Sequence, residues 1–234
     1  MAGRIAYTGG IVTNGLILNL DAAKRDSYPG SGTSWRDISG NNSNTTLTLI
    51  SGSTFTSTFN GTFAFNGTVS FADMPIQNFA TSTSFSVETV MSVPSYNQFG
   101  SRAHFLSGTG GNSMIIFTAT TLNMWNEAGG VNNLQISATF TAGTTYHVIV
   151  TRDTNNLVTL YTNGSFIGSG SRDGQFRWAT IGRLGSGTTF CSIINLSTVK
   201  IYNRALSSTE VTQNYNALKG RFGLWVLYQE DQVL

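Results

Sequence analysis

The chain has little of several features that would place it in a particular class of protein. Of its 234 residues, one is cysteine, three are proline and 10% are charged. The lone Cys191 excludes an intrachain disulfide, and we expect it to be a buried apolar residue. No run of about 18 apolar residues occurs, so no membrane-spanning helix and no membrane partner are predicted. The fold must therefore rest on its hydrophobic core, which a chain of this length can supply.

Charge of either sign is sparse and scattered. Thirteen Lys and Arg residues oppose eleven Asp and Glu residues, which gives a net charge of +2. Electrostatic binding to nucleic acid needs clustered cations, so a nucleic-acid partner is not expected. Residues 1–11 lack the basic and apolar regions of a secretory signal, which predicts synthesis in a cytoplasm.

The residues that are plentiful favour short strands and tight turns. The chain has 26 glycines and 15 phenylalanines, and 40% of it is hydrophobic. Asn-Gly pairs at 60–61, 66–67 and 163–164 supply the positive φ values of tight hairpins. Apolar side chains alternate along Phe85–Val93, and Tyr146–Thr151 is apolar on both faces, as in a covered central strand. These patterns predict an all-β fold.

One helix is predicted near the C-terminus. Ser207 and Glu210 have the spacing of a capping box, in which each side chain bonds the backbone of the other residue. Val211, Tyr215 and Leu218 then recur at the spacing of one apolar helix face. We expect Gly220 to end this helix.

Several motifs resemble those of one known family. Residues 18–22 read LNLDA, 27–32 read SYPGSG, 35–41 read WRDISGN, 202–207 read YNRALS and 214–223 read NYNALKGRFG. The hairpin LYTNG at 160–164 and TIGR at 180–183 are similar to strands of laminin-G-like domains. The chain thus resembles the laminin-G-like jelly rolls of the concanavalin A-like lectin/glucanase superfamily, in the version found in structural proteins of tailed phages.

The resemblance implies a two-sheet antiparallel jelly-roll sandwich with one short C-terminal helix. We expect residues 1–12 to form an N-terminal arm, 13–222 the sandwich and 223–234 an apolar C-terminal tail. The resemblance also implies a virion location and a non-enzymatic structural role, in which the protein decorates or cements the capsid or a tail structure of the particle. The expected partners are other virion proteins and further copies of the chain, with a trimer as the analogy-based default. The alternative is an adhesin on the virion that binds host surface glycans.

The sequence contains no recognisable set of catalytic residues. Family members that cleave glucans carry two or three carboxylates closely spaced on one strand, because hydrolysis needs a carboxylate pair. No such group occurs here, and Glu88 stands alone on its strand. A hydrolytic triad would require His104 or His147 beside a nucleophile. His147 lies in an apolar strand, where a hydrogen-bonded structural histidine is the better interpretation. We therefore predict no catalytic residues.

Metal ligands are also too few for a predicted site. The best local cluster is Asp37 with Asn41, Asn42 and Asn44, whereas calcium takes six to eight oxygen ligands. A turn in which Asp37 accepts bonds from nearby amides explains this cluster better. The family often has an acidic residue before its last core strand, but Cys191–Ser197 contains none. No metal or other cofactor is predicted.

Two sets of residues are candidates for binding. Aromatic residues beside amide and arginine donors are typical of sugar sites, and both candidate pairs here adjoin glycine-rich loops. The candidate glycan-binding residues are Trp125, Asn126, Arg177 and Trp178. The tail is unusually apolar and must bury its side chains somewhere. It either forms a final strand on its own domain or anchors on a neighbouring subunit; the candidate assembly contacts are Leu224, Trp225, Val226, Leu227 and Tyr228.

Overall fold

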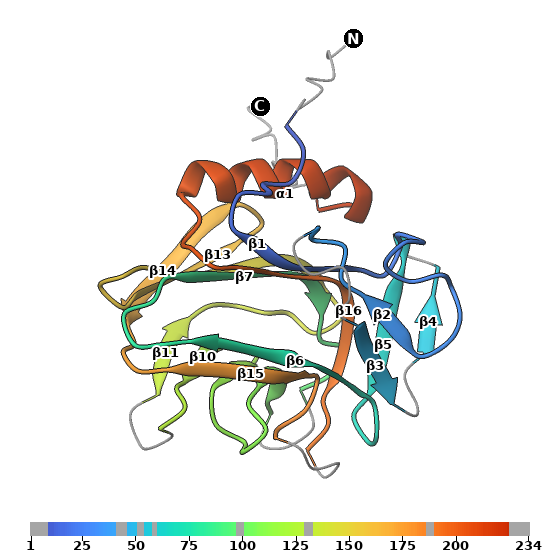
Figure 1. Ribbon diagram of the computed structural model, residues 1–234, viewed down its shortest axis with the longest axis horizontal. Coiled ribbons are helices and arrows are strands. Elements are labelled where there is room, and N and C mark those ends of the chain that lie inside the picture. Colours follow the sequence, from blue (N-terminus) through green and yellow to red (C-terminus); the bar gives the residue numbers. More distant parts are fainter. Residues whose placement is uncertain are drawn as a thin grey trace, which may run out of the picture.

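Two antiparallel sheets packed face to face form the protein, and one helix lies across the outer side of one of them (Figure 1). The computed structural model describes residues 9–40, 46–50, 54–57, 60–96, 101–128, 133–185 and 190–224. The sandwich confirms the predicted fold class. Both sheets have eight strands, and every strand pairing in them is antiparallel.

Sheet A has the order β14-β13-β12-β7-β16-β5-β4, with β1 also paired to β16. Its strands are β1 (Leu16–Asp21), β4 (Thr54–Thr56), β5 (Thr62–Asn66), β7 (Phe85–Ser92), β12 (Thr145–Arg152), β13 (Leu157–Thr162), β14 (Ser165–Ser171) and β16 (Ile193–Tyr202). Sheet B has the order β11-β10-β9-β8-β15-β6-β3-β2. Its strands are β2 (Ser34–Arg36), β3 (Thr46–Ile50), β6 (Phe71–Phe79), β8 (Ala103–Ser107), β9 (Met114–Phe117), β10 (Thr121–Trp125), β11 (Leu134–Ser137) and β15 (Phe176–Ile181).

The core lies between the sheets and is rich in aromatic rings. Phe85 of sheet A meets Phe176 and Trp178 of sheet B at centroid distances of 5.4 and 5.1 Å. Arg152 closes this end of the core: its guanidinium carbon lies 4.8 Å from the Phe85 ring centre. The guanidinium also donates to the carbonyls of Thr83, Ala80 and Gly174, which satisfies a buried charge.

Helix α1 (Ser208–Phe222) begins as the sequence predicts. The Ser207 hydroxyl accepts a bond from the Glu210 amide and the Glu210 carboxylate accepts one from the Ser207 amide, so the capping box is present. The predicted end at Gly220 is wrong. The helix continues for two further residues, and Gly223 ends it in the left-handed conformation with φ 64°. Gly223, and not Gly220, therefore occupies the helix-ending position that needs a positive φ.

Helix α1 packs on sheet A, and a buried polar cluster centred on Glu88 joins the two. The Glu88 carboxylate accepts bonds from Lys200 Nζ at 3.1 Å and from His147 Nε2 at 3.2 Å. Its other oxygen accepts from Tyr202 Oη at 3.2 Å and from Asn214 Nδ2 of the helix at 2.6 Å. The expected structural role of His147 is therefore confirmed, and the outer face of β7 is covered rather than solvated.

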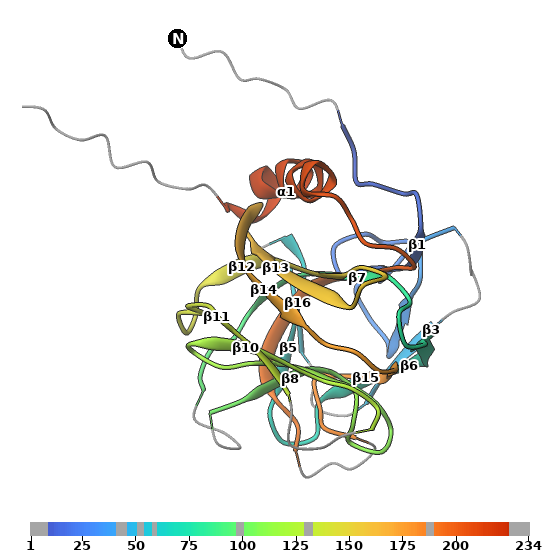
Figure 2. The same ribbon diagram turned by 90° about the vertical axis from the view of Figure 1, so that its left-hand side faces the viewer.

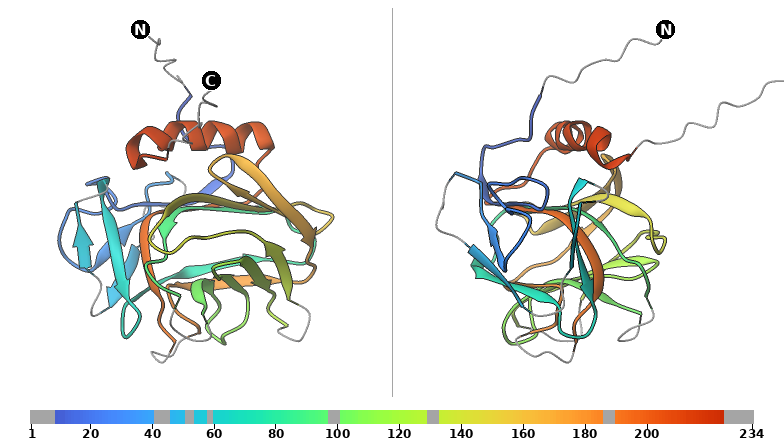
Figure 3. Two further views of the ribbon diagram at one scale, coloured as in Figure 1. Left: turned by 180° about the vertical axis from the view of Figure 1, so that it is seen from behind. Right: turned by 90° about the vertical axis from the view of Figure 1, so that its right-hand side faces the viewer.

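The predicted hairpin at Asn163–Gly164 is confirmed. Both residues have positive φ, 49° and 78°, and they join β13 to β14 directly below the helix, as Figure 3 shows from behind. Figure 2 looks at the side of the sandwich where β14 of sheet A approaches β11 of sheet B. The strand indicated by the TIGR motif at 180–183 is longer than the motif, because β15 already begins at Phe176.

Candidate functional site

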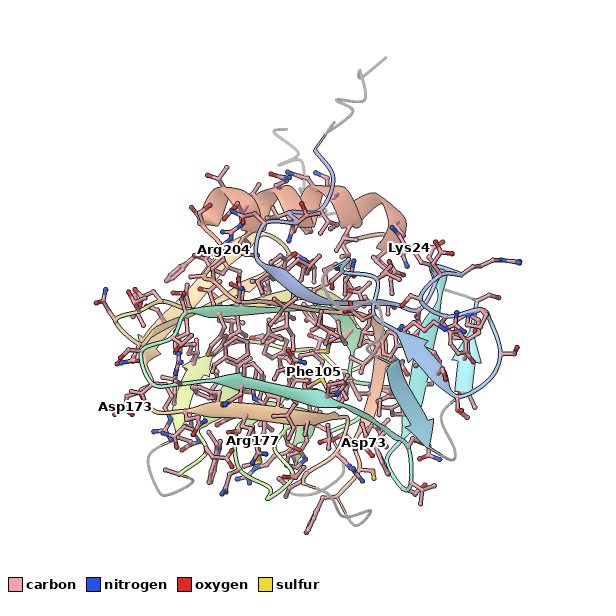
Figure 4. The ribbon with its side chains drawn as sticks, in the orientation of Figure 1. Lys24, Asp73, Phe105, Asp173, Arg177 and Arg204 are labelled. Carbon is pink, nitrogen blue, oxygen red and sulfur yellow. The ribbon has the colours of Figure 1, made fainter. Side chains whose placement is uncertain are left out.

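The candidate site lies on the outer face of sheet B, on the opposite side of the sandwich from α1. In Figure 4, Arg177 and Asp73 project at the bottom of the molecule, while the helix crosses the top. The face follows from strand alternation: Leu122 and Met124 of β10 enter the core, so Trp125 points outward. We call Ser113, Trp125, Asn126, Glu127 and Arg177 the rim.

Trp125, Asn126 and Glu127 occupy the end of β10 and the turn after it. Trp125 pairs in register with Met114 of β9, and its side chain is half-buried. The buried Asn126 donates from Nδ2 to the Asp173 carbonyl at 3.1 Å, and the Glu127 amide donates to the Gln175 carbonyl at 2.7 Å. Both bonds tie the turn to the segment that leads into β15.

Ser113 joins this turn to Arg177. Its amide donates to the Asn126 carbonyl at 3.2 Å, and its hydroxyl donates to Glu127 Oε2 at 2.7 Å. The same hydroxyl oxygen accepts from the Arg177 amide at 2.9 Å. Gly108 permits the close approach, because a Cβ there would lie 2.7 Å from the Arg177 carbonyl oxygen. These bonds bring the Glu127 carboxylate, the Arg177 strand and the turn after Trp125 together.

Three of the four predicted glycan-binding residues therefore come together, and the fourth does not. Trp125, Asn126 and Arg177 belong to the rim. Trp178 is 0% exposed and packs among core phenylalanines, so it has no face to offer a ligand. The reason is strand alternation: Arg177 and Trp178 are neighbours on β15 and must point to opposite sides.

Sequence reasoning missed Ser113, and it did not place Glu127 among the candidate glycan-binding residues. No local pattern marks Ser113, because its role depends on strands that meet only in the folded protein. Arg177 keeps its guanidinium without a bonding partner among the described residues. A half-buried arginine and a carboxylate offer donors and acceptors of the kind that hydroxyl-rich ligands require.

An ion pair extends the same face. Asp73 of β6 forms an ion pair with Arg183, whose guanidinium carbon lies 3.5 Å from the centre of the Phe71 ring. Between this pair and the rim, the buried Ser107 hydroxyl bonds Thr180 Oγ1 at 2.8 Å. The outer face of β15 is thus polar along its length.

The histidines have the wrong surroundings for catalysis. His147 is buried under α1 against Glu88, as described above. Burial and the nearby charge of Arg102 lower the pKa of His104 to about 4, so it is neutral at pH 7. Neither ring reaches solvent, and a general base must reach its substrate.

A groove of about 410 Å³ lies on the other side of the molecule, beside the C-terminal half of α1. Its lining includes Lys24, Lys200 and Arg221. Two of these cations are already paired, Lys200 with Glu88 and Arg221 with both oxygens of Asp21 at 2.6 Å. The groove is therefore a less suitable site for an anionic ligand than its three cations suggest.

The expected turn, in which Asp37 accepts hydrogen bonds from nearby amides, is confirmed within the described residues. One carboxylate oxygen accepts from the Asn19 and Ser39 amides, both at 2.8 Å, and the other accepts from the Ser39 hydroxyl. Asn41, Asn42 and Asn44 lie outside the described residues. Among the residues that are described, no group of three His, Cys, Asp or Glu side chains is arranged to hold a metal ion.

Of the predicted assembly contacts, the structure describes Leu224, at the end of the helix. Leu224 is buried within its own domain, its amide donates to the Lys219 carbonyl at 3.0 Å, and its carbonyl accepts from Tyr215 Oη. It is thus part of the helix C-terminus of its own domain. Trp225, Val226, Leu227 and Tyr228 lie outside the described residues. Cys191 is buried, as expected.

Solved structures of similar fold include two binding domains and an enzyme. The binding domain of Paraclostridial Mosquitocidal Protein 1 is 22% identical with a TM-score of 0.68, over 88% of this chain and 52% of that one. The receptor-binding domain of botulinum neurotoxin type G is 18% identical with a TM-score of 0.62, over 86% and 51%. Trypanosoma rangeli sialidase in complex with sialic acid is 13% identical with a TM-score of 0.60, over 88% and 33%.

The chain spans about half the length of those toxin domains and a third of the sialidase, so the likeness establishes the fold. No curated protein matches the sequence. In the part of the chain that is described, α1 is too short and too polar to cross a membrane. The sequence model of the concanavalin A-like lectin/glucanases superfamily matches residues 60–212, well over half of the chain. The protein therefore belongs to the concanavalin A-like lectin/glucanase superfamily, in its laminin-G-like branch.

Proposed function

We propose that the protein is a non-enzymatic binding domain whose rim binds a carbohydrate. The observation that carries the proposal is the rim itself: Ser113 holds the Glu127 carboxylate and the Arg177 strand at the turn that follows the half-buried Trp125. An aromatic face with fixed donors and acceptors around it suits a sugar, which has apolar C–H faces and hydroxyl edges. The buried histidines and the bonded Glu88 support binding without hydrolysis.

The similar structures support a binding role by analogy. Two of them are described as binding or receptor-binding domains, and a third was solved with sialic acid. The placement of the chain ends adds a physical reason. Gln213 and Tyr215 of α1 bond the carbonyls of Gly10 and Leu224, so both ends of the described domain lie at the helix face. A domain attached to a larger structure through these two ends would present its rim on the side facing away from the attachment.

The test is a screen of the purified protein against an array of bacterial surface oligosaccharides, followed by titration of any ligand found. Trp125→Ala and Arg177→Ala should each weaken binding about tenfold or more, since single central contacts carry that much affinity. Phe166→Ala is the matched control, because Phe166 is an exposed aromatic residue on β14 of the opposite sheet. A glycan that binds all three variants equally would place its site away from the rim. Absence of binding across the array would contradict the carbohydrate proposal.

The second candidate is a structural protein of a tailed-phage particle, at the capsid or the tail. It is supported by the resemblance of the chain's terminal motifs to phage structural proteins and by the position of both described ends on one face. In this role the helix face would contact other virion proteins, and copies of the chain would associate, with a trimer expected. Light scattering of the purified protein measures the mass directly, and a monomer at micromolar concentration would oppose self-association.

A further inference from the structure

A pocket of about 110 Å³ lies on the outer face of sheet A, where the C-terminal end of α1 meets the sheet. One water needs roughly 10–15 Å³ of such space, so the pocket admits several waters or one small ring-shaped molecule. None of the described residues that line it carries a charge. Its polar lining includes Thr62, Ser92, Thr145, Asn195 and Ser197, and Phe222 of the helix adds an aromatic wall.

A row of polar side chains across three adjacent strands forms one side of the pocket, which we call the floor. Ser92 of β7 is in register with Thr145 of β12 and, on its other side, with Asn195 of β16. Met91 and Leu196 enter the core, so their neighbours Ser92 and Asn195 point outward. Asn195 Nδ2 donates to Ser92 Oγ at 3.2 Å, which orients the amide. The floor therefore consists of Ser92, Thr145 and Asn195 on one face of the sheet.

A β-bulge in β16 shapes the pocket beside this floor. The register between β16 and β7 shifts between Leu196 and Thr198, so Ser197 is the extra residue. Ser197 Oγ lies 2.8 Å from Thr62 Oγ1 of β5. Bulges are found next to functional sites more often than elsewhere, because they re-aim a side chain. Here the bulge sets two bonded hydroxyl groups at the wall of the pocket.

Phe222, the last residue of α1, supplies the apolar side of the pocket. The preceding residue, Arg221, donates to both carboxylate oxygens of Asp21 at 2.6 Å and to the Asn60 carbonyl at 3.2 Å. These bonds hold the end of the helix on the sheet. A half-buried aromatic ring beside hydroxyl and amide groups suits a molecule that has both C–H faces and hydroxyl edges.

Polar groups of the floor remain available to such a molecule. Among the described residues, the Thr145 hydroxyl and Asn195 Oδ1 have no hydrogen-bond partner, and the Ser92 hydroxyl accepts a bond but donates none. A hydroxyl both donates and accepts, whereas the amide oxygen accepts only. The floor thus offers two donors and several acceptors, and it offers no charge to an ion.

We propose that this pocket binds a neutral, polyhydroxylated molecule about the size of one sugar ring. The volume limits the ligand to that size, and the uncharged lining selects a neutral one. The pocket lies on sheet A and the rim on sheet B, so this inference does not depend on the carbohydrate proposal for the rim.

Titration of the ¹⁵N-labelled full chain, followed by amide chemical shifts, tests the pocket. The probes are the methyl glycosides of glucose, galactose, mannose and N-acetylglucosamine, each to about 10 mM, a range that detects millimolar affinity. At least one probe should shift the amide resonances of Ser92, Thr145 and Asn195. Thr145→Val and Asn195→Ala should each weaken that binding about tenfold, because each removes a hydrogen-bonding group of the floor.

Two control variants separate the pocket from other surfaces. Thr159→Val makes the same substitution on β13 of the same sheet, where Thr159 faces outward between the core residues Val158 and Leu160. Trp125→Ala alters the rim. Neither variant should change the titration, and unchanged resonances along β13 show that Asn195→Ala remains folded. A probe that binds the parent chain, Thr145→Val and Asn195→Ala equally would overturn the proposal, and so would the absence of shifts at the floor with all four probes.

Discussion

Replacing Glu88 by glutamine is expected to lower the free energy of unfolding by about 3 kcal/mol at pH 7. The carboxylate is fully buried between sheet A and α1 and receives four hydrogen bonds, one of them from the Lys200 ammonium group. Glutamine keeps the shape but leaves Lys200 charged and without its counter-ion. Removing one partner of a buried ion pair costs about 3–5 kcal/mol, because the remaining charge stays desolvated.

The lowered pKa of Glu88 reflects the same interactions. Burial alone would raise this pKa, but the charge of Lys200 and the bond from His147 outweigh burial and bring it from 4.5 to about 2. That difference corresponds to about 3 kcal/mol at 1.36 kcal/mol per pH unit. For a chain of this size it lowers the melting temperature by about 6–12 °C.

The sign of the pH dependence follows from the lowered pKa. The contribution is fully present above the unfolded-state pKa of about 4.5 and is lost as pH falls through the folded value of about 2. Because glutamine resembles a protonated glutamate, the difference in unfolding free energy between parent and Glu88→Gln should shrink between pH 5 and pH 2.

Urea unfolding followed by circular dichroism measures both effects. Glu88→Gln/Lys200→Met is the matched double variant: it removes both charges and should be more stable than Glu88→Gln alone. A loss below about 1 kcal/mol for Glu88→Gln, or a double variant less stable than the single one, would refute the reasoning. The buried ion pair would then contribute nothing specific to the attachment of the helix.

Two further substitutions test the local structure around the helix. Ser207→Ala removes the capping bond and should cost about 1 kcal/mol in urea unfolding, whereas Thr212→Ala on the exposed helix surface should change stability by less than about 0.5 kcal/mol; equal effects would mean that the cap adds nothing. Gly164→Ala and Gly143→Ala both place a side chain at positive φ, but only the first meets a neighbour, the Tyr215 ring at 2.7 Å. Both variants should lose about 1 kcal/mol of unfolding free energy to backbone strain, and Gly164→Ala should lose about 1–3 kcal/mol more. Thermal unfolding measures this difference, which vanishes if the Tyr215 ring simply moves aside.

The positions of the rim and of the chain ends bear on what the domain does. The rim is on sheet B, whereas the Glu88 cluster, the helix and both described ends lie on the outer side of sheet A. The core separates the two faces, so substitutions at the rim should leave the helix attachment intact. Loss of ligand binding in Trp125→Ala can therefore be separated from loss of folding.

Local sequence determined the features whose physical cause is itself local. The Ser207–Glu210 capping box predicted the start of α1, because its bonds join residues three apart. Asn163–Gly164 predicted the hairpin turn, because both residues tolerate positive φ. The alternation in Phe85–Val93 predicted correctly which side chains of that strand enter the core. The family motifs supplied the fold as a whole.

Only the tertiary structure decided which residues share a site. Trp178 and Arg177 are neighbours in sequence, but strand β15 turns one into the core and the other to the rim. Ser113 carries no signal of its own, and it becomes central because β9 places it between the Glu127 turn and β15. The charge of Glu88 is likewise satisfied by Asn214, a residue 126 positions away in the chain. Such contacts depend on strand register and helix placement, which arise from the packing of the whole chain and from no single segment of it.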